Sequence, residues 1–152
     1  MATMRLEFVA QDHSVFSGDV TAVQAPGAEG QLGILPKHAP LMTVLSPGEV
    51  VVQREGAEPL YFAVSGGWME VRPDQVTILA RTAERSDQID AARAEAARAR
   101  AAQLLAQGIR RDQRALVELS LKRQIVRLRV SGRRRGWYGP TASESDTQTK
   151  IE

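Results

Sequence analysis

The sequence predicts a mainly β amino-terminal sandwich or barrel over residues 1–87, an antiparallel α-helical hairpin over residues 88–135 and a disordered tail over residues 136–152. Three observations support this fold class. Short β-like runs recur between turn-forming residues up to about residue 80, an alanine-rich segment without Gly or Pro follows from Ile89, and Ser, Thr and acidic residues dominate the final stretch. The period of the apolar residues changes near Ile89, so we expect the domain boundary there.

The β part is predicted from residues that alternate between apolar and polar with a period of two. Residues 4–11 alternate most clearly, and further β-like runs lie at residues 20–23, 31–35, 41–45, 50–54, 60–64, 68–72 and 76–80. They are separated by turn formers, namely Ser17-Gly18-Asp19, Pro26-Gly27, Pro36, Pro47-Gly48, Gly56, Gly66-Gly67 and Pro73-Asp74. Short strands at near-regular spacing with turns between them are typical of a sandwich or barrel.

The helical hairpin is predicted from composition and from one interruption. Residues 89–107 contain nine alanines, which gives this segment high helix propensity. Gly108 then interrupts, and we expect Asp112 to cap a second helix that runs to about Arg135. The second helix carries one apolar stripe, widened by Leu116 and Leu119, at Val117, Leu121, Ile125 and Leu128. Because alanine methyls bury little area, at roughly 25 cal/mol per Å² we expect weak pairing and a hairpin that is able to open.

Charge divides the chain in the same way. Six basic and eleven acidic side chains give residues 1–88 a net charge of −5, and thirteen and four give residues 89–135 a net charge of +9. One basic and three acidic side chains give residues 136–152 a charge of −2, which completes the total of +2. The near-neutral total therefore hides a strongly basic hairpin that is suited to an acidic partner.

Several classes of protein are excluded by what the sequence lacks. It contains no cysteine, so a disulfide framework, a thiolate zinc site and a cysteine nucleophile are impossible. No apolar run approaches the roughly 20 residues of a membrane span, and the first residues lack the apolar core of a signal peptide, so we expect a mature cytosolic chain. Neither a phosphate-binding G-K-S/T loop nor a G-x-S-x-G elbow occurs, and the two histidines have no ligand spacing. We therefore predict no enzymatic activity, no catalytic residue and no metal site.

Two sequence blocks resemble the ε subunit of F-type ATP synthases. The first is GQLGILPKHAPL at residues 30–41, and the second is VSGGWMEV at residues 64–71, followed by VTILA at residues 76–80. Both blocks occur in the order and at the distance that the family shows. The basic segment at residues 89–135 is similar to the family's carboxy-terminal hairpin, although alanine- and arginine-rich helices are common.

The resemblance implies a noncatalytic rotor subunit. In the family the β-sandwich docks on the γ subunit and the c-ring, so that c-ring rotation is coupled to ATP synthesis. The hairpin lies folded on the sandwich or extends along γ toward the α/β catalytic subunits, where it restrains ATP hydrolysis. For this chain the resemblance implies a peripheral position on the cytoplasmic face of a bacterial cell membrane, with no cofactor required and ATP as a possible regulatory ligand.

IDAARA at residues 89–94 fits a family pattern that binds ATP in some bacterial members. The resemblance makes Asp90 and Arg93, with Arg123 and Arg127 of the second helix, candidates for ATP sensing. Helical spacing places each pair on one face, and guanidinium groups suit phosphate oxygens. A structural reading is favoured over this one: Asp90 stabilises a helix N-terminus and pairs with Arg93, and the other two arginines are solvated or meet the catalytic β subunit.

The resemblance also assigns three contact surfaces. Glu29, Gln31 and His38 are the candidates for the c-ring, where Gln31 replaces the family's usual Glu and Lys37 its usual Gly. For His38 a role in stabilising the turn is about equally favoured. The candidates for γ docking are Ser65, Gly66, Gly67 and Trp68, and those for contact with the catalytic β subunit are Lys122, Arg129, Arg133 and Arg134.

One alternative function comes from a different class. RRRGWY at residues 133–138 combines positive charge with aromatic rings, which is typical of proteins that grip single-stranded nucleic acid. A basic run is more often a solvated or protein-facing patch, so a nucleic-acid partner is not our expectation.

Overall fold

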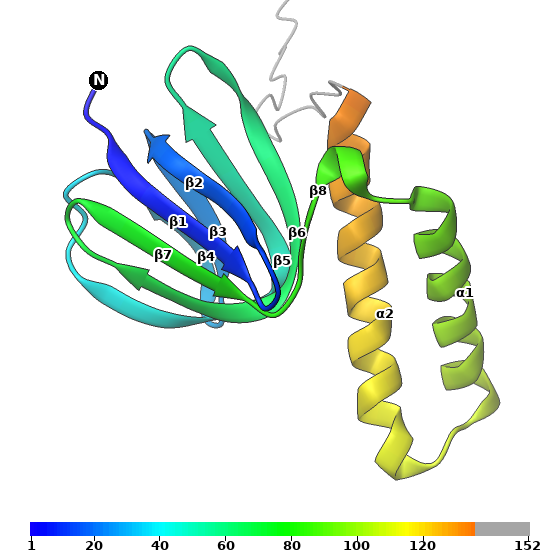
Figure 1. The fold of residues 1–152 in the computed structure, drawn as a ribbon. Coiled ribbons are helices and arrows are strands. Elements are labelled where there is room, and N and C mark those ends of the chain that lie inside the picture. Colours follow the sequence, from blue (N-terminus) through cyan, green and yellow to red (C-terminus); the bar gives the residue numbers. More distant parts are fainter. Residues whose placement is uncertain (136–152) are drawn as a thin grey trace, which may run out of the picture.

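The computed structural model describes residues 1–135, with side chains as far as Arg133 (Figure 1). The strands are β1 Met4–Ala10, β2 Ser14–Val20, β3 Ala22–Gly27, β4 Gly30–Ile34, β5 Leu41–Arg54, β6 Ala57–Val71, β7 Gln75–Ala80 and β8 Ala83–Arg85. The helices are η1 Ser86–Gln88, α1 Ala91–Gln107, α2 Arg111–Ser131 and η2 Gly132–Arg135, where η marks a 3₁₀ turn. The predicted mainly β sandwich followed by a helical hairpin is confirmed, and the predicted disorder of residues 136–152 lies outside the described residues.

The strands form one sheet that folds over itself, in the order β2-β1-β7-β6-β5-β3-β4, with β8 added beside β6. All pairs are antiparallel except β1 and β7, which run parallel. The two longest strands pass through both halves of the sandwich: the first half of β6 pairs with β8, and its second half pairs with β7. Figure 1 shows the layers closing around a common interior.

Three predicted turns are wrong, because the residues concerned lie inside strands. Ser17-Gly18-Asp19 belongs to β2, Pro47-Gly48 to β5 and Gly66-Gly67 to β6. Pairing continues across two of these sites, where Pro47 lies opposite Ser65 and Leu45 opposite Gly67. The turn formers therefore bend long strands instead of ending them, because neighbouring strands still supply hydrogen-bond partners on both sides.

The core of the sandwich comes from the alternation that the sequence shows. In β1 the residues Met4, Leu6, Phe8 and Ala10 are buried, and the residues between them are half-buried or exposed. Phe8 meets Phe62 of β6 edge to face, with ring centroids 5.1 Å apart. The core therefore ties the first strand to the long central strand.

Helix α1 begins two residues later than predicted, since Ile89 lies before the helix and Asp90 is its N-cap. Gly108 ends α1 with φ of 76°, a conformation that favours glycine. The predicted capping by Asp112 is wrong. The N-cap of α2 is Arg110, without a side-chain hydrogen bond, and Asp112 lies within the first turn.

The predicted apolar stripe of α2 is wrong in part. Ile125 is 47% exposed, whereas Val126 and Val130, which lie outside the stripe, are buried. The sequence pattern alone missed that α2 has two neighbours, the sheet on one side and α1 on the other.

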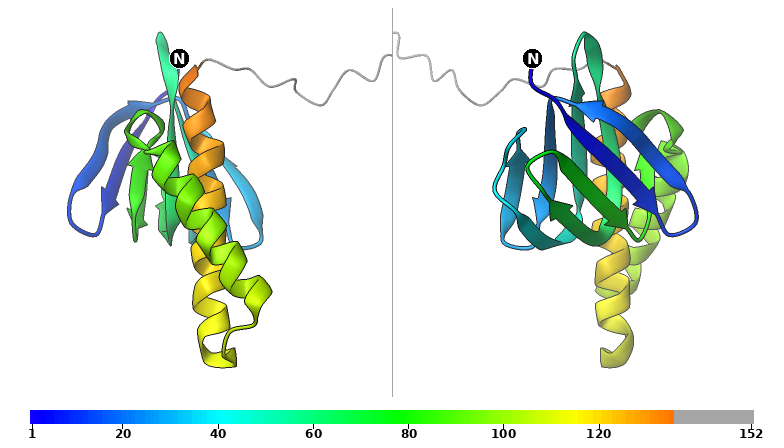
Figure 2. Two further views of the ribbon diagram at one scale, coloured as in Figure 1. Left: turned by 90° about the vertical axis from the view of Figure 1, so that its right-hand side faces the viewer. Right: turned by 60° about the vertical axis from the view of Figure 1, so that its left-hand side comes forward.

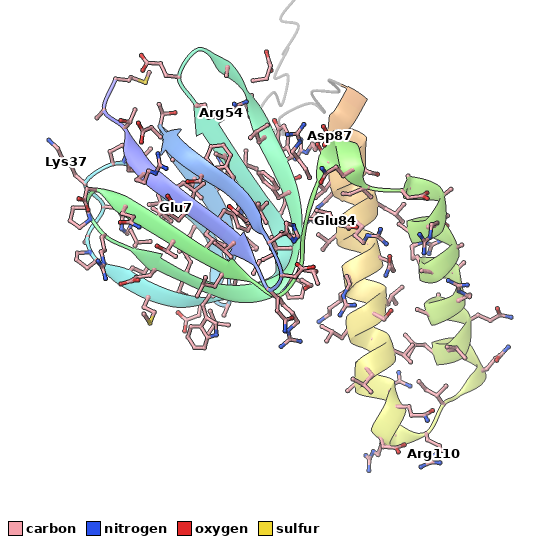
Figure 3. All side chains as sticks on the ribbon, viewed as in Figure 1. Glu7, Lys37, Arg54, Glu84, Asp87 and Arg110 are labelled. Carbon is pink, nitrogen blue, oxygen red and sulfur yellow. The ribbon has the colours of Figure 1, made fainter. Side chains whose placement is uncertain are left out.

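α2 lies between the sheet and α1 and contacts β5 and β6 (Figures 1 and 2). The side chains of α1 that are fully buried are alanines, Ala94 and Ala101. The end of the hairpin near Arg110 extends beyond the sandwich (Figures 2 and 3). Within residues 1–135, no helix has the combination of length and apolarity that crossing a membrane requires.

Candidate functional site

The boundary between the sandwich and α2 contains a small apolar cluster. Val126 and Val130 of α2 pack with Ala63 of β6 and with Ile89, the residue that joins η1 to the N-cap of α1. Tyr61 of β6 borders the cluster and is half-buried. Since four buried side chains of modest size make up this contact, hydrophobic burial alone attaches the hairpin only moderately.

An ion pair flanks this cluster on one side. The Nε of Arg127 donates to Glu84 of β8 at 2.6 Å, and its Nη2 donates to the second oxygen of the same carboxylate at 3.2 Å. The Nη1 of Arg127 donates to Gln124 at 2.8 Å. Figure 3 shows Glu84 on the edge of the sandwich beside α2. A bidentate, partly buried pair of this kind fixes the position of α2 as well as stabilising it.

A second ion pair lies near the end of α2. Arg133 donates from Nε and Nη2 to the two carboxylate oxygens of Glu49 in β5, at 3.3 and 3.4 Å. Its guanidinium group also lies 5.3 Å from the ring centroid of Tyr61. Within residues 1–133, the hairpin is thus attached to the sandwich by one apolar cluster and two arginine–glutamate pairs.

A pocket of about 320 Å³ lies between β6, β8 and α2. Its lining residues are Ala63, Val64, Ser65, Thr82, Glu84, Arg123, Gln124, Val126 and Arg127. Within the described part of the chain, the Nε of Arg123 is buried and has no hydrogen-bond partner. A buried guanidinium nitrogen without a partner is costly, so this pocket is suited to an anion.

The four candidates for ATP sensing form two separate groups. Arg123 and Arg127 line the pocket under α2. Asp90 accepts a hydrogen bond from the backbone N–H of Arg93 at 3.1 Å, as an N-cap does, and the side chains of both residues are exposed. Among residues 1–133, no hydrogen bond or ion pair joins one group to the other.

Trp68 belongs to an exposed apolar patch on the sheet. Val44 in β5 and Leu79 in β7 lie directly opposite it on the two neighbouring strands, so all three share one face. Met42 lies two residues before Val44 and extends the same face. We call Met42, Val44, Trp68 and Leu79 the Trp68 patch; their exposed fractions lie between 43% and 68%. Exposed apolar side chains that lie together make this face a candidate interaction surface.

The other three candidates for γ docking stabilise the sheet itself. Ser65 is only 9% exposed, and its hydroxyl accepts a hydrogen bond from Thr82 at 2.6 Å. Gly66 and Gly67 have φ of 114° and 149°, and a Cβ on Gly67 would lie 2.1 Å from the carbonyl oxygen of Leu79. Of the four candidates, Trp68 alone has an exposed side chain.

The three candidates for c-ring contact do not lie together. Glu29 and Gln31 are exposed beside the turn between β3 and β4, and Gln31 lines a pocket with Arg129 of α2 and Arg133 of η2. His38 follows the opposite end of β4, and its Nδ1 lies 2.7 Å from the carbonyl oxygen of Ala39. Its neighbour Lys37 lies on the side of the sandwich away from the helices (Figure 3). β4 therefore separates the two groups.

The candidates for contact with the catalytic β subunit are not equally available. Lys122 and Arg129 are exposed, and Arg133 is held by Glu49. The side chain of Arg134 lies outside the described residues.

On α1, a hydrogen bond from Arg98 lowers the pKa of Glu95 below its usual value.

Sequence reasoning missed the sandwich residues that hold the hairpin, namely Glu49, Tyr61 and Glu84. The single available signal was the excess of acidic residues in the β part, which did not indicate which carboxylates face α2. It also missed Val44 and Leu79, which strand alternation alone does not distinguish from core residues.

A sandwich with an exposed apolar patch on its sheet, and with a basic hairpin attached by a few contacts, defines a subunit built to assemble with other proteins. The sequence of residues 3–86 matches the family model for the β-sandwich domain of ATP synthase delta/epsilon chains. Sequence similarity continues into the hairpin. The chain is 48% identical over 128 residues to an ATP synthase epsilon chain of Chloroflexus aggregans, covering 84% of this chain and 91% of that one.

Further relatives agree. An ATP synthase epsilon chain of Herpetosiphon aurantiacus is 48% identical over 132 residues, covering 87% of this chain and 96% of that one. A chain in the structure of the Euglena gracilis mitochondrial ATP synthase, OSCP/F1/c-ring, has a TM-score of 0.73 and 26% identity, with 80% of this chain and 77% of that chain covered. This chain belongs to the ATP synthase epsilon chain family.

Proposed function

We propose that this chain is a noncatalytic rotor subunit of an F-type ATP synthase, whose sandwich docks on γ and the c-ring and whose hairpin restrains ATP hydrolysis. The observation that supports this most directly is the limited attachment of the hairpin. In the part of the chain whose side chains are described, one small cluster and two ion pairs join α2 and η2 to the sandwich. Such a contact holds α2 in place and is weak enough to be exchanged for contacts with another protein.

The docking half of the proposal is supported by the Trp68 patch. Its apolar side chains lie on β5, β6 and β7, whereas α2 contacts β5 and β6 around Tyr61 and Ala63. A partner that covers this patch does not compete with the hairpin for the same residues. We assign the patch to γ, and we assign the turn carrying Glu29 and Gln31 to the c-ring. His38, at the opposite end of β4, is the third candidate for c-ring contact, with stabilisation of its own turn as the alternative.

The regulatory half is supported by the charge of the hairpin. If the folded state is favoured about 100-fold, roughly 2.7 kcal/mol of additional contact makes the folded and extended states equally populated. A few arginine–carboxylate pairs with the α/β subunits supply this amount. Exposed cations on α2 such as Lys122 and Arg129 are available for these pairs at the start of the movement.

The test is ATP hydrolysis by a reconstituted α/β/γ head, measured with the full chain and with a chain that ends at Asp87. We expect the full chain to suppress hydrolysis and the shortened chain to bind γ without suppressing it. Equal hydrolysis with both chains would show that the hairpin does not inhibit. A full chain with Trp68→Ala tests docking separately, because it keeps the hairpin and loses the central side chain of the patch.

A second function, ATP sensing, is favoured by the unpartnered Nε of Arg123 in the pocket under α2. Because Arg127 is already bound by Glu84, ATP would have to displace that carboxylate or bind beside it. ATP titrated into the full chain should bind more weakly after Arg123→Ala and unchanged after Arg100→Ala, an exposed arginine on α1. Equal binding by both variants would contradict ATP sensing at this pocket.

We propose no nucleic-acid partner, since the relatives are ATP synthase chains.

A subunit that docks on the rotor would be a peripheral component on the cytoplasmic face of a bacterial membrane. Binding of the chain to inverted membrane vesicles, with and without their ATP synthase, tests this location.

A further inference from the structure

Glu49 and Tyr61 form a preformed site for a guanidinium group on the sandwich. Glu49 pairs with Ala63 and Val51 pairs with Tyr61 across β5 and β6, so Glu49, Tyr61 and Ala63 share the face that α2 covers. The Glu49 side chain is 12% exposed and the Arg133 side chain 41% exposed. In the folded chain the carboxylate is therefore largely covered, and the guanidinium lies at the more exposed margin of the contact.

We propose that this site is an internal competitor for Arg133: it binds the guanidinium that the extended hairpin offers to an acidic surface of the catalytic head. This inference rests on the proposed inhibitory function and adds the residues that control it. Arg133 contacts both oxygens of Glu49 through Nε and Nη2 and lies over the ring of Tyr61. While it is held in this way, the same donors are not available to a carboxylate of the partner.

Because Arg133 exchanges one carboxylate for another, opening of the hairpin is selective for an acidic partner surface. When α2 leaves the sandwich, the ion pair between Arg133 and Glu49 and the contact of Arg133 with Tyr61 are both lost, which disfavours opening without a partner. An acidic partner surface restores an equivalent pair for Arg133, whereas an apolar surface does not. The partner class that fits is therefore a protein surface with clustered carboxylates.

This proposal and a simple clamp predict different effects on inhibition when Arg133 is removed. For a clamp, removing either Glu49 or Arg133 frees the hairpin and strengthens inhibition to the same extent. For an exchanged group, removing Glu49 strengthens inhibition, and removing Arg133 frees the hairpin but weakens its grip on the partner. Glu49→Gln and Arg133→Gln therefore separate the two readings: the first preserves side-chain size, and the second replaces the guanidinium with an uncharged polar group.

The experiment measures hairpin position and hydrolysis on the same variants. Because the chain contains no cysteine, the exposed pair Gln53→Cys and Gln107→Cys accepts labels for a distance measurement in the full chain. Inhibition is measured as the concentration of chain that halves ATP hydrolysis by the reconstituted α/β/γ head. The matched controls are Glu58→Gln, an exposed carboxylate in β6, and Arg100→Gln, an exposed arginine in α1.

We expect Glu49→Gln, which removes the ion pair, to increase the extended-to-folded ratio about two- to fivefold, and Arg133→Gln, which also removes the cation–π contact, to increase it about five- to tenfold. Glu49→Gln should lower the half-inhibitory concentration by a similar factor, Arg133→Gln should not lower it, and the controls should match the parent. The proposal is overturned if Glu49→Gln leaves the label distance unchanged, or if Arg133→Gln inhibits as strongly as Glu49→Gln. If the parental chain itself does not inhibit, the proposed function fails and the exchange with it, and the label distances still show whether Glu49 holds α2.

Discussion

Truncation of Trp68 is predicted to remove most of the affinity of this subunit for γ and to leave its fold intact. Trp68 is 55% exposed, and it lies between Val44 and Leu79 at the middle of an apolar face. Side chains of this kind, central in a patch and aromatic, contribute the largest share of binding energy at protein interfaces.

The magnitude follows from the exposed area. A tryptophan side chain that is a little more than half exposed offers on the order of 120 Å² to a partner, which at about 25 cal/mol per Å² corresponds to about 3 kcal/mol. At about 1.4 kcal/mol per tenfold, Trp68→Ala should weaken binding on the order of 100-fold. The remaining part of the ring is buried against the sheet, so Trp68→Ala should also lower the free energy of unfolding, by roughly 2–3 kcal/mol at the same ~25 cal/mol per Å².

The assay is titration calorimetry of the chain into an α/β/γ head that lacks its epsilon chain. The matched control is Leu35→Ala, which removes an apolar side chain that is 62% exposed and lies outside the Trp68 patch. The control should bind within about twofold of the parent. Binding of Trp68→Ala within about threefold of the parent would refute the assignment of the patch to γ.

Three further predictions concern the fold and the hairpin boundary. Val130→Ala removes two methyl groups from a fully buried site and should lower stability by about 1–3 kcal/mol. Hydrogen exchange should become faster in α2 and not in β1. Equally faster exchange in both elements would contradict a loss of stability confined to the contact between α2 and the sandwich. Gly67→Ala places a Cβ 2.1 Å from the Leu79 carbonyl oxygen and should cost several kcal/mol of thermal stability, whereas Gly33→Ala, with open space around it, should cost little. Asp90→Ala removes the cap of α1 and should lower helix stability by about 1 kcal/mol, measured by hydrogen exchange. Asp90→Asn should recover most of this stability. No recovery would show that Asp90 acts through its charge.

The sequence was most informative where the pattern is local. The alternation in residues 4–10 predicted a half-buried strand, and β1 buries the predicted face. The alanine-rich segment predicted a helix that pairs through small side chains, and Ala94 and Ala101 are the buried residues of α1. Turn formers were the least reliable signal, because Pro47-Gly48 and Gly66-Gly67 bend strands whose pairing continues on both sides.

The sequence by itself determined the fold class, the position of the hairpin and the basic character that suits it to an acidic partner, since composition and short-range periodicity decide these properties. Only the tertiary structure decided which carboxylates hold the arginines, because Arg127 and Glu84 are 43 positions apart and Arg133 and Glu49 are 84 apart. Only the pairing of β5, β6 and β7 brought Trp68 together with Val44 and Leu79. Contacts of this range depend on strand register and on the packing of α2 against the sheet, which no local pattern in the chain encodes.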